Sequence, residues 1–259
     1  MHISAHQNGK LFVDLYCIQD HCRILDVSSY NMNGTLREFR REGMDYVGVD
    51  MAAGPGVDMV MPSPDEIPFG DNEFDAVVTT STCEHAAHFW LLLLEMIRVV
   101  KPGGYIYINA PSNGAFHQYP FDYWRFYPDA GLAFVDWARK NGHVVGLVES
   151  GICRQGAEQW SDFVAVLQKA DRVAHGADFI STSGEGFLNV RLYNREGILN
   201  LSNDTEDQLK LKSLQCEFDE TRRRLAKAEK KLNRRLEIRL ARWWRSLLGK
   251  RVAGALTSV

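Results

Sequence analysis

The chain has few cysteines and no long apolar run. Its 259 residues include five cysteines, which form no Cys-x-x-Cys pair and no zinc-like series. An odd, scattered set of thiols disfavours a disulfide framework, so we expect a reducing compartment. The longest apolar run, Phe89 to Leu94, is far below the ~18 residues that suggest a membrane span, and the start lacks the basic and apolar regions of a signal peptide. The sequence therefore predicts a cytoplasmic protein that is neither exported by a signal peptide nor integral to a membrane.

A strong overall charge is also missing, because the formal net charge is only −3. The charge is nevertheless unevenly distributed along the chain. Residues 221–259 hold 13 Lys and Arg against two acids, Glu229 and Glu237, whereas the remainder holds 17 against 31. An acidic body disfavours a nucleic-acid partner, and the basic tail suits phosphate, anionic lipid or the acidic body itself.

The sequence does contain a repeated alternation of apolar strands and amphipathic segments between residue 23 and about residue 169. This pattern predicts an α/β fold with a doubly wound seven-stranded sheet covered by helices. The expected strands are 23–27, 46–50, 57–60, 74–80, 105–110, 144–148 and 163–167, and the expected helices are 35–42, 89–100 and 128–141. Ligands of such folds bind outside the carboxyl ends of the strands, so the candidate site is formed by the loops after Val27, Asp50, Thr80 and Ala110.

Composition divides the chain into three regions. Residues 1–170 are expected to form the main domain. Residues 171–205 are polar and rich in Gly, Ser and Asn, which predicts a linker that docks partly through an apolar patch at residues 187–192. Residues 206–259 are expected to be a helical extension.

The extension carries apolar residues at heptad spacing over about three heptads, which predicts a coiled-coil helix that needs a partner. The a and d positions are occupied by Leu211, Leu214, Phe218, Leu225, Ala228 and Leu232. We expect residues 206–240 to mediate homo-oligomerisation or assembly with another protein. Residues 240–256 place Trp243 and Trp244 among basic residues, as interfacial helices do, so contact with an anionic membrane surface is expected there.

Two segments of the sequence together predict a nucleoside-binding pocket. A buried strand ending in Asp26 and Val27 runs into a small, polar loop from Ser28 to Gly34, through which backbone can approach a ligand. About twenty residues later a second strand ends in Asp50, a carboxylate placed to accept hydrogen bonds from vicinal ribose hydroxyls. Two plainer roles stay open, with Asp26 as a loop-bracing acid and Asp50 as a turn residue at a strand end.

The continuation resembles the class I S-adenosylmethionine-dependent methyltransferases in order and spacing. The resemblance covers about residues 22–169, and its segments are Asp65-Glu66-Ile67-Pro68-Phe69-Gly70-Asp71-Asn72-Glu73-Phe74-Asp75, Glu84-His85 and Arg98-Val99-Val100-Lys101-Pro102-Gly103-Gly104. A further run is similar to a bacterial branch associated with surface polysaccharide synthesis, and it reads His117-Gln118-Tyr119-Pro120-Phe121-Asp122-Tyr123-Trp124-Arg125-Phe126.

The resemblance implies a Rossmann-like methyltransferase fold with S-adenosylmethionine as the cofactor. Nine positions would line that cofactor: Asp26, Ser28, Tyr30, Asn33 and Gly34 along its methionine part, Asp50 at the ribose, Met51 against the adenine, and Phe69 and Ser81 at the rim of the pocket. The loop after the first strand departs from the family pattern, because only Gly34 remains of its usual glycines. The contact to the adenine edge is left to Ser63, Asp65 or backbone.

Methyl transfer to oxygen needs a base near the acceptor hydroxyl. His117 is the candidate base and His85 its competitor, because both lie on loops at the same end of the sheet. Asp122 would orient a histidine or hold a sugar hydroxyl, and Arg125 would grip an anionic acceptor. The plainer alternative makes the histidines a helix cap and a loop brace, and makes the other two residues a structural ion pair. Carboxylates and imidazoles show no obvious ligand spacing, so no metal ion is expected.

The resulting hypothesis is an S-adenosylmethionine-dependent O-methyltransferase that methylates a sugar of a bacterial surface polysaccharide, with a glycan or lipid-linked sugar as acceptor. The extension would assemble the enzyme or hold it peripherally at the inner face of the cytoplasmic membrane. Two alternatives stay open. One is a non-catalytic, cofactor-binding scaffold that recruits glycosyltransferases through its coiled coil, and the other is a methyltransferase of a small metabolite. The acceptor assignment depends on family analogy.

Overall fold

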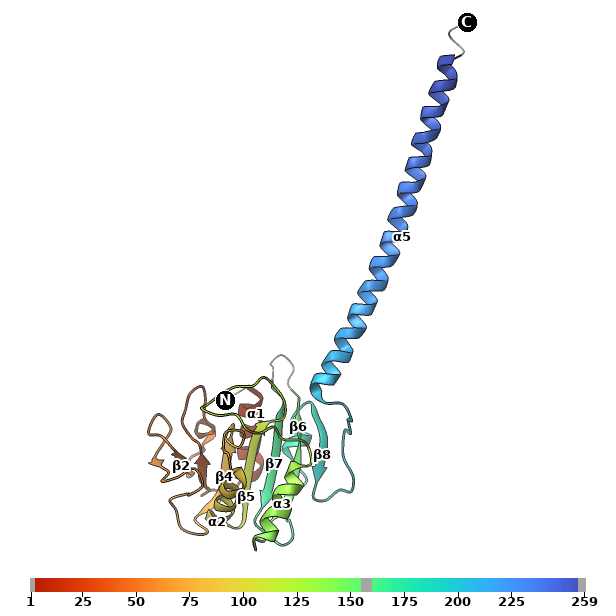
Figure 1. Ribbon diagram of the computed structural model, residues 1–259. Helices are drawn as coiled ribbons and strands as arrows, with labels where there is room; N and C mark the ends of the chain where they lie inside the picture. Colours follow the sequence, from red (N-terminus) through yellow and green to blue (C-terminus); the bar gives the residue numbers. More distant parts are fainter. Residues whose placement is uncertain (1–2, 155–159, 256–259) are drawn as a thin grey trace. The chain divides into compact units, whose positions relative to one another are not determined.

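The computed structural model describes residues 3–154 and 160–255, without the side chains of residue 206 and of residues 246–255. The chain divides into two compact units, Met1–Asn203 and Asp204–Val259. Most of the expected linker, residues 171–203, therefore belongs to the first unit. The expected boundary at residue 170 is too early, because the segment that follows it adds a helix and a strand to this unit (Figure 1).

Within the described residues, a mixed sheet of eight strands forms the first unit (Figure 1). The strands are β1 (Arg23–Val27), β2 (Asp45–Asp50), β3 (Met59–Val60), β4 (Phe74–Thr80), β5 (Val100–Pro111), β6 (Gly146–Cys153), β7 (Asp162–Gln168) and β8 (Phe187–Leu192). Their order is β3-β2-β1-β4-β5-β7-β6-β8, and β7 pairs antiparallel with β5 and β6, as β8 does with β6. All seven expected strands are present, and β8 comes from the apolar patch of the expected linker.

The parallel half of the sheet positions the candidate site. β1 pairs in parallel with β2 on one side and with β4 on the other. The strand order reverses between β1 and β4, and a crevice for ligands forms outside the carboxyl ends of the strands at such a point. Both strands are largely buried, as expected for parallel strands that are covered on both faces.

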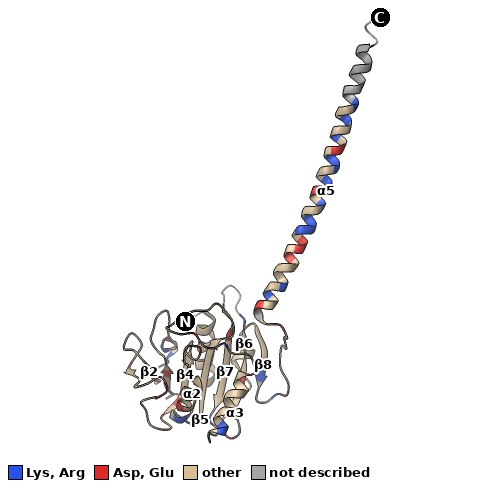
Figure 2. Ribbon diagram, in the orientation of Figure 1, with Lys and Arg blue, Asp and Glu red and all other residues tan. Residues whose placement is uncertain are grey.

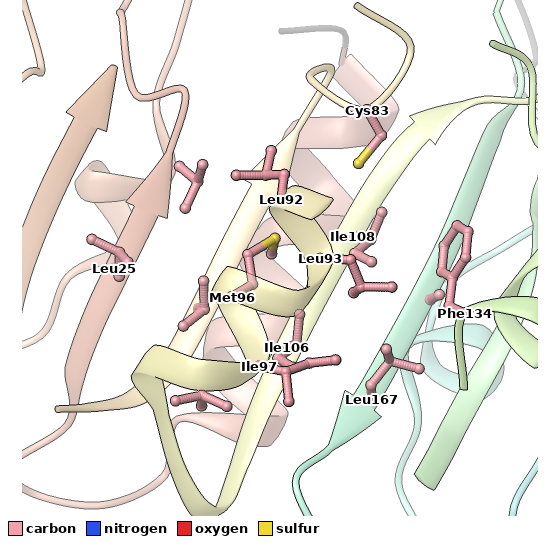
Figure 3. Close-up of a cluster of buried hydrophobic side chains, with 14 of the residues drawn as sticks. Leu25, Cys83, Leu92, Leu93, Met96, Ile97, Ile106, Ile108, Phe134 and Leu167 are labelled. Carbon is pink, nitrogen blue, oxygen red and sulfur yellow. The ribbon is translucent and has the colours of Figure 1, made fainter. Parts of the chain in front are cut away.

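Helices α2 (Phe89–Val99) and α3 (Ala130–Lys140) cover one face of the sheet. Figure 3 shows side chains of α2 packing over Ile106 and Ile108 of β5, with Phe134 of α3 close to Leu167 of β7. The buried side chains of α2 are Leu92, Leu93, Met96, Ile97 and Val99. Burial of each large apolar side chain contributes about 1.5–3 kcal/mol. The apolar spacing of α2 was readable in the sequence, and the helix ends one residue earlier than expected because β5 begins directly after it.

The opposite face is covered by α1 (Ile3–Tyr16), the 3-10 helix η1 (Leu36–Phe39) and the short helix α4 (Ile180–Ser183). The sequence did not predict α1, because small and polar residues such as Ser4, Asn8 and Gly9 occupy part of its buried face. The helix expected at residues 35–42 is only the four residues of η1. It begins with a capping box between Thr35 and Glu38 and ends where Arg40 leaves helical geometry.

The second unit is a single helix, α5 (Glu206–Ala255). Its start is capped by Thr205, whose hydroxyl accepts from the Gln208 amide, while the Gln208 side chain accepts from the Thr205 amide. The large heptad residues are more than half exposed, with Leu211 at 56%, Phe218 at 67% and Leu225 at 59%. Figure 2 shows Lys and Arg distributed along the helix, with Asp and Glu mostly in its first half. The helix is confirmed, and its pairing into a coiled coil stays a prediction.

In the part of the chain that the structure describes, no helix combines the length and the apolar character that crossing a membrane requires.

Candidate active site

The loop after β1 folds back over the end of β2. Ser28 has a left-handed backbone (φ 68°), and the amides of Ser28 and Ser29 both donate to the Val49 carbonyl at 2.8 and 3.0 Å. The Asn31 side-chain oxygen accepts from the Gly34 amide at 2.9 Å, and Asn33 is exposed in the same turn. The loop that the sequence predicted along the methionine part of a cofactor is thus shaped by hydrogen bonds to β2 and by one within the loop.

Glycines of β2 and of the loop that follows it permit this close approach. A Cβ atom on Gly48 would collide with the Gly56 carbonyl and the Ser29 side chain, and one on Gly54 would collide with the Tyr30 ring. The glycines that are missing after β1 are therefore replaced by glycines on the neighbouring strand and its loop. The spacing of these glycines is visible in the sequence, but their role depends on the pairing of β1 with β2.

Asp50 ends β2 and accepts hydrogen bonds from two loops. Its Oδ2 accepts from the Tyr30 amide at 3.0 Å, and its Oδ1 accepts from the Ala52 amide at 3.3 Å. A carboxylate has about four acceptor positions, so two are left for hydroxyl groups of a ligand. Met51 is 47% exposed beside it. The geometry suits the predicted ribose contact and also the plainer role as a brace of the turn.

Asp26 lies inside β1, where its carboxyl group accepts from the Tyr46 hydroxyl at 2.7 Å. The side chain is buried, and this burial raises its pKa to about 7, against the smaller lowering effects of Tyr46 and Arg37. Its contact with Tyr46 supports the bracing role that the sequence had left open.

Ser81 and Phe69 lie at opposite ends of the sheet. Ser81 follows β4 and donates its amide to the Asn109 carbonyl at 2.9 Å, so it lies at the carboxyl end with the loops described above. Phe69 packs edge to face on Phe74, the first residue of β4. The expectation that Phe69 lines the cofactor pocket is therefore corrected, because the chain passes to the amino end of β4 before this residue.

Two buried hydroxyls at the carboxyl ends of β1 and β4 test whether a polar ligand fits there. The Oγ of Ser29 and the Oγ1 of Thr80 have no hydrogen-bond partner among the described residues. Buried polar groups are normally paired, so a polar molecule between these strands would supply partners that the chain does not. With Asp50 nearby on β2, these residues fit a cofactor that carries ribose hydroxyls and an amino acid part.

A carboxylate and two imidazoles meet at the carboxyl ends of β4 and β5. Glu84 and His85 lie in the turn after β4, and His117 lies in the loop after β5. One potential ligand atom from each of the three lies within 4.8 Å of the others, and the two imidazole centroids are 4.9 Å apart. No metal ion was expected, because the sequence shows no obvious ligand spacing. The fold nevertheless brings together side chains that are 32 and 33 positions apart.

The three groups differ in burial and protonation. Glu84 is 1% exposed, and burial raises its pKa to about 8. The Nδ1–H of His85 donates to the Phe121 carbonyl, which leaves its Nε2 as an acceptor 3.7 Å from Glu84 Oε1. Burial lowers the pKa of His85. His85 is therefore a neutral imidazole near pH 7 with one free lone pair.

Asp122 and Arg125 form a two-pronged ion pair behind His117. Arg125 donates to both carboxylate oxygens, at 2.5 and 2.7 Å, and these bonds hold the pKa of Asp122 well below its usual range. Asp122 also accepts from the His117 amide at 2.8 Å, and its Oδ2 lies 3.4 Å from His117 Nδ1. Because Arg125 donates further to the carbonyls of Trp124 and Ala115, the structure supports a positioning ion pair rather than a grip on an anionic acceptor.

The loop after β5 presents exposed aromatic rings beside the cluster. Phe116 is 74% exposed, Tyr119 60% and Phe121 55%. The Tyr119 hydroxyl reaches the Met32 sulfur at 3.4 Å, which connects this loop with the loop after β1. A separate hollow of about 650 Å³ lies between α4 and β8 and contains none of these residues. We therefore place the chemistry at the carboxyl ends of β1, β2, β4 and β5.

Comparison with known proteins finds a matching family for part of the chain. Residues 25–108, which run from β1 to β5 and include Asp50, Glu84 and His85, match the family described as "Methyltransferase domain". The match covers the carboxyl ends of β1 and β4 and stops before His117.

Curated relatives are similar over part of their length. A protein named "Uncharacterized methyltransferase" from Mycobacterium sp. (strain KMS) is 39% identical over 75 residues, which are 26% of this chain and 30% of the relative. The demethylmenaquinone methyltransferase of Renibacterium salmoninarum is 31% identical over 117 residues, which are 41% of this chain and 48% of the relative. The chain thus spans less than half the length of these relatives.

A solved structure has the same fold. The 1,6-didemethyltoxoflavin-N1-methyltransferase of Burkholderia thailandensis, with bound 1,6-didemethyltoxoflavin and S-adenosylhomocysteine, superposes with a TM-score of 0.52 at 14% identity, over 65% of this chain and 79% of that chain. Residues 25–108 therefore match a methyltransferase domain, and the first unit shares its fold with a methyltransferase of known structure.

Proposed function

We propose that this chain is an S-adenosylmethionine-dependent O-methyltransferase. The observation that carries the proposal is the placement, at the carboxyl ends of one sheet, of the Asp50 carboxylate and of the neighbouring His85 and His117 imidazoles. The carboxylate suits recognition of a nucleoside, and the imidazoles suit removal of a hydroxyl proton. The family match of residues 25–108 supports the same activity.

Asp50 would accept hydrogen bonds from the ribose hydroxyls of the cofactor. The turn from Ser28 to Gly34 and the hydroxyls of Ser29 and Thr80 would bind its amino acid part, with Met51 on the adenine face. S-Adenosylmethionine supplies the activated methyl group, and the chain's own task is to bind and orient it and to hold the acceptor in line.

The acceptor hydroxyl would bind beside Glu84, His85 and His117. His117 remains the candidate base, because Asp122 Oδ2 lies 3.4 Å from its Nδ1. Asp122 is itself fixed by its ion pair with Arg125. His85 is the second candidate, because its tautomer leaves Nε2 free to accept a proton. A positioned base contributes about 10²- to 10⁴-fold to the rate of such a transfer.

We further propose that the acceptor is a sugar of a bacterial surface polysaccharide or of its lipid-linked precursor. The exposed rings of Phe116, Tyr119 and Phe121 would stack on the C–H faces of sugars. The same rings also favour a second candidate, an apolar, lipid-like acceptor. That candidate gains support from curated relatives named for demethylmenaquinone and for phthiotriol or phenolphthiotriol dimycocerosates.

Calorimetric binding of S-adenosylmethionine tests the proposed cofactor site. Asp50→Ala should weaken binding by about 1 to 3 kcal/mol, because it removes an acceptor of two hydroxyl hydrogen bonds. The matched control is Asp45→Ala at the opposite end of β2, where the side chain is exposed and pairs with Arg23; its affinity should equal that of the wild type. Equal affinities for Asp50→Ala and wild type, or no binding by wild type, would contradict the assignment.

Turnover separates an enzyme from the non-catalytic scaffold that the altered loop after β1 had suggested. A scaffold would bind the cofactor without transferring methyl groups to glycan or apolar acceptors. Labelled methyl transfer from the bound cofactor, followed by mass spectrometry of each acceptor class, identifies the substrate.

A further inference from the structure

The cluster of Glu84, His85 and His117 has the composition of a metal site. It offers one carboxylate oxygen and two imidazole nitrogens, with one ligand atom from each within 4.8 Å of the others. Two imidazoles and one carboxylate bind divalent first-row metal ions and leave further coordination positions open.

Glu84 is the strongest indication that something is bound there. Its side chain is 1% exposed, and its Oε2 has no hydrogen-bond partner among the described residues. A buried, unpaired carboxyl oxygen is costly, and such groups usually have a partner or bind a metal ion. Because Arg125 is already engaged by Asp122, it does not neutralise Glu84 directly.

The surroundings of His85 match those of a metal-binding imidazole, and His117 beside it has a ring nitrogen that is unpaired within the described part of the chain. The Nδ1–H of His85 donates to a backbone carbonyl, which fixes the tautomer and turns Nε2 toward Glu84. The Nδ1 of His117 lies 3.4 Å from Asp122 Oδ2, but it is buried and makes no hydrogen bond among the described residues. Ligand histidines almost always have a carboxylate or carbonyl partner of this kind at their second nitrogen.

We propose that Glu84, His85 and His117 bind a divalent transition-metal ion of the zinc class, and that its open positions receive the oxygen of the acceptor. The assignment of the acceptor rests on the proposed function, whereas the binding of the ion does not. With the ion in place, both imidazoles are ligands, and Asp122 and Arg125 are positioning residues.

The bound ion, rather than a histidine base, would promote the loss of the hydroxyl proton from the acceptor. Coordination lowers the pKa of the acceptor hydroxyl, and its proton leaves to bulk water. The oxygen–methyl bond then forms as the methyl–sulfur bond of the cofactor breaks, and the sulfur keeps the electron pair of that bond. The step therefore needs no further reactant.

Metal binding to the full-length, chelator-treated protein tests the proposal directly. We expect one Zn²⁺ per chain by calorimetry, with affinity reduced more than about 100-fold in Glu84→Gln and in His117→Ala, since loss of a supporting contact alone costs about 10- to 100-fold. The matched control is His88→Ala, an exposed histidine of the same loop, which should bind as the wild type does. X-ray absorption of the zinc-loaded protein should show nitrogen and oxygen ligands at about 2.0–2.1 Å.

Three outcomes overturn the proposal: no Zn²⁺ bound by wild type, equal affinity in wild type and Glu84→Gln, or preferential binding of Mg²⁺. Glu84→Gln keeps the side-chain volume, and its thermal unfolding checks that it is folded. Calorimetry of S-adenosylmethionine on the metal-free protein separates the two proposals. Cofactor binding without zinc binding leaves the methyltransferase function intact and removes only the ion.

Discussion

The surroundings of two aspartate side chains shift their pKa values in opposite directions. Burial raises the pKa of Asp26 to about 7, and the Tyr46 hydroxyl offsets this only in part. Asp122 is also buried, yet its two hydrogen bonds from Arg125 hold its pKa well below its usual range. Asp26 is therefore protonated in much of the protein near neutral pH, whereas Asp122 is a permanent anion behind His117.

The raised pKa of Asp26 predicts a pH-dependent contribution to stability. Because the folded state binds this proton more tightly than the unfolded chain, the contribution is full below about pH 4 and is lost as the pH rises to about 7. Asp26→Asn stays neutral, so the free energy of unfolding of wild type relative to this variant should fall by about 2 to 3 kcal/mol between pH 5 and pH 7. Urea denaturation measures it. Asp45→Asn serves as an exposed control without the trend, and a pH-independent difference for Asp26→Asn would contradict the assignment.

At the scale of elements, one carboxylate ties two helices to the sheet. Glu149 of β6 is 1% exposed and accepts from the Tyr16 hydroxyl of α1. It also accepts from the amides of Ile180 and Ser181 at 2.8 and 3.0 Å, and from the Ser181 hydroxyl at 2.6 Å. These amides open α4 and have no partner within that helix. Polar docking of this kind explains how α1 packs stably with a weak apolar stripe.

Removal of this carboxylate should loosen α1 and α4 together. Glu149→Ala leaves two buried amides and two hydroxyls without an acceptor, so we expect a loss of about 3 kcal/mol or more in the free energy of unfolding. Hydrogen exchange in both helices should accelerate. Glu185→Ala, an exposed acid close to α4 in the sequence, should change stability by less than about 0.5 kcal/mol. A similarly small effect of Glu149→Ala would show that apolar packing alone holds the helices.

At the scale of the whole molecule, the two units differ in charge and in apolar exposure. The heptad side chains of α5 are exposed, and Trp243 and Trp244 are 56% and 59% exposed among basic residues. We propose that residues 206–240 self-associate as a coiled coil or pair with a glycosyltransferase. Residues 240–256 would contact an anionic membrane surface, although the side chains of residues 246–255 and residue 256 itself lie outside the described residues.

A protein that ends at Asp204 tests both parts of this proposal. Sedimentation should give a multiple of the monomer mass for the full chain and a monomer for the shortened protein, because a lone helix with an apolar stripe gains stability from a partner. Flotation with anionic liposomes should carry only the full chain, and less of it at high salt, since each basic residue near the surface contributes about 1 kcal/mol. Equal masses would exclude self-association, and absence from liposomes at low salt would exclude the membrane contact.

Much of this architecture is encoded locally. The apolar runs of β1, β4 and β7 and the helical spacing of α2 lie within short stretches of sequence, so periodicity was enough to predict them. Helix α1 and strand β8 escaped prediction because their burial depends on partners far along the chain: Glu149 for α1 and β6 for β8. For η1 the sequence predicted too much helix, because the helical pattern of residues 35–42 does not continue beyond Arg40 in the structure.

The features of the site also separate into those predicted from the sequence and those set by the tertiary structure. The sequence by itself determined that Asp50 ends a strand and that His85 and His117 lie on loops at the same end of the sheet. Strand ends and turns are specified by residues that are close together in the sequence. Only the tertiary structure decided that Glu84 joins those histidines, that Arg125 is engaged by Asp122, and that Phe69 lies at the far end. The physical reason is that these contacts depend on the path of loops across the sheet, which is set by packing among residues distant in the sequence.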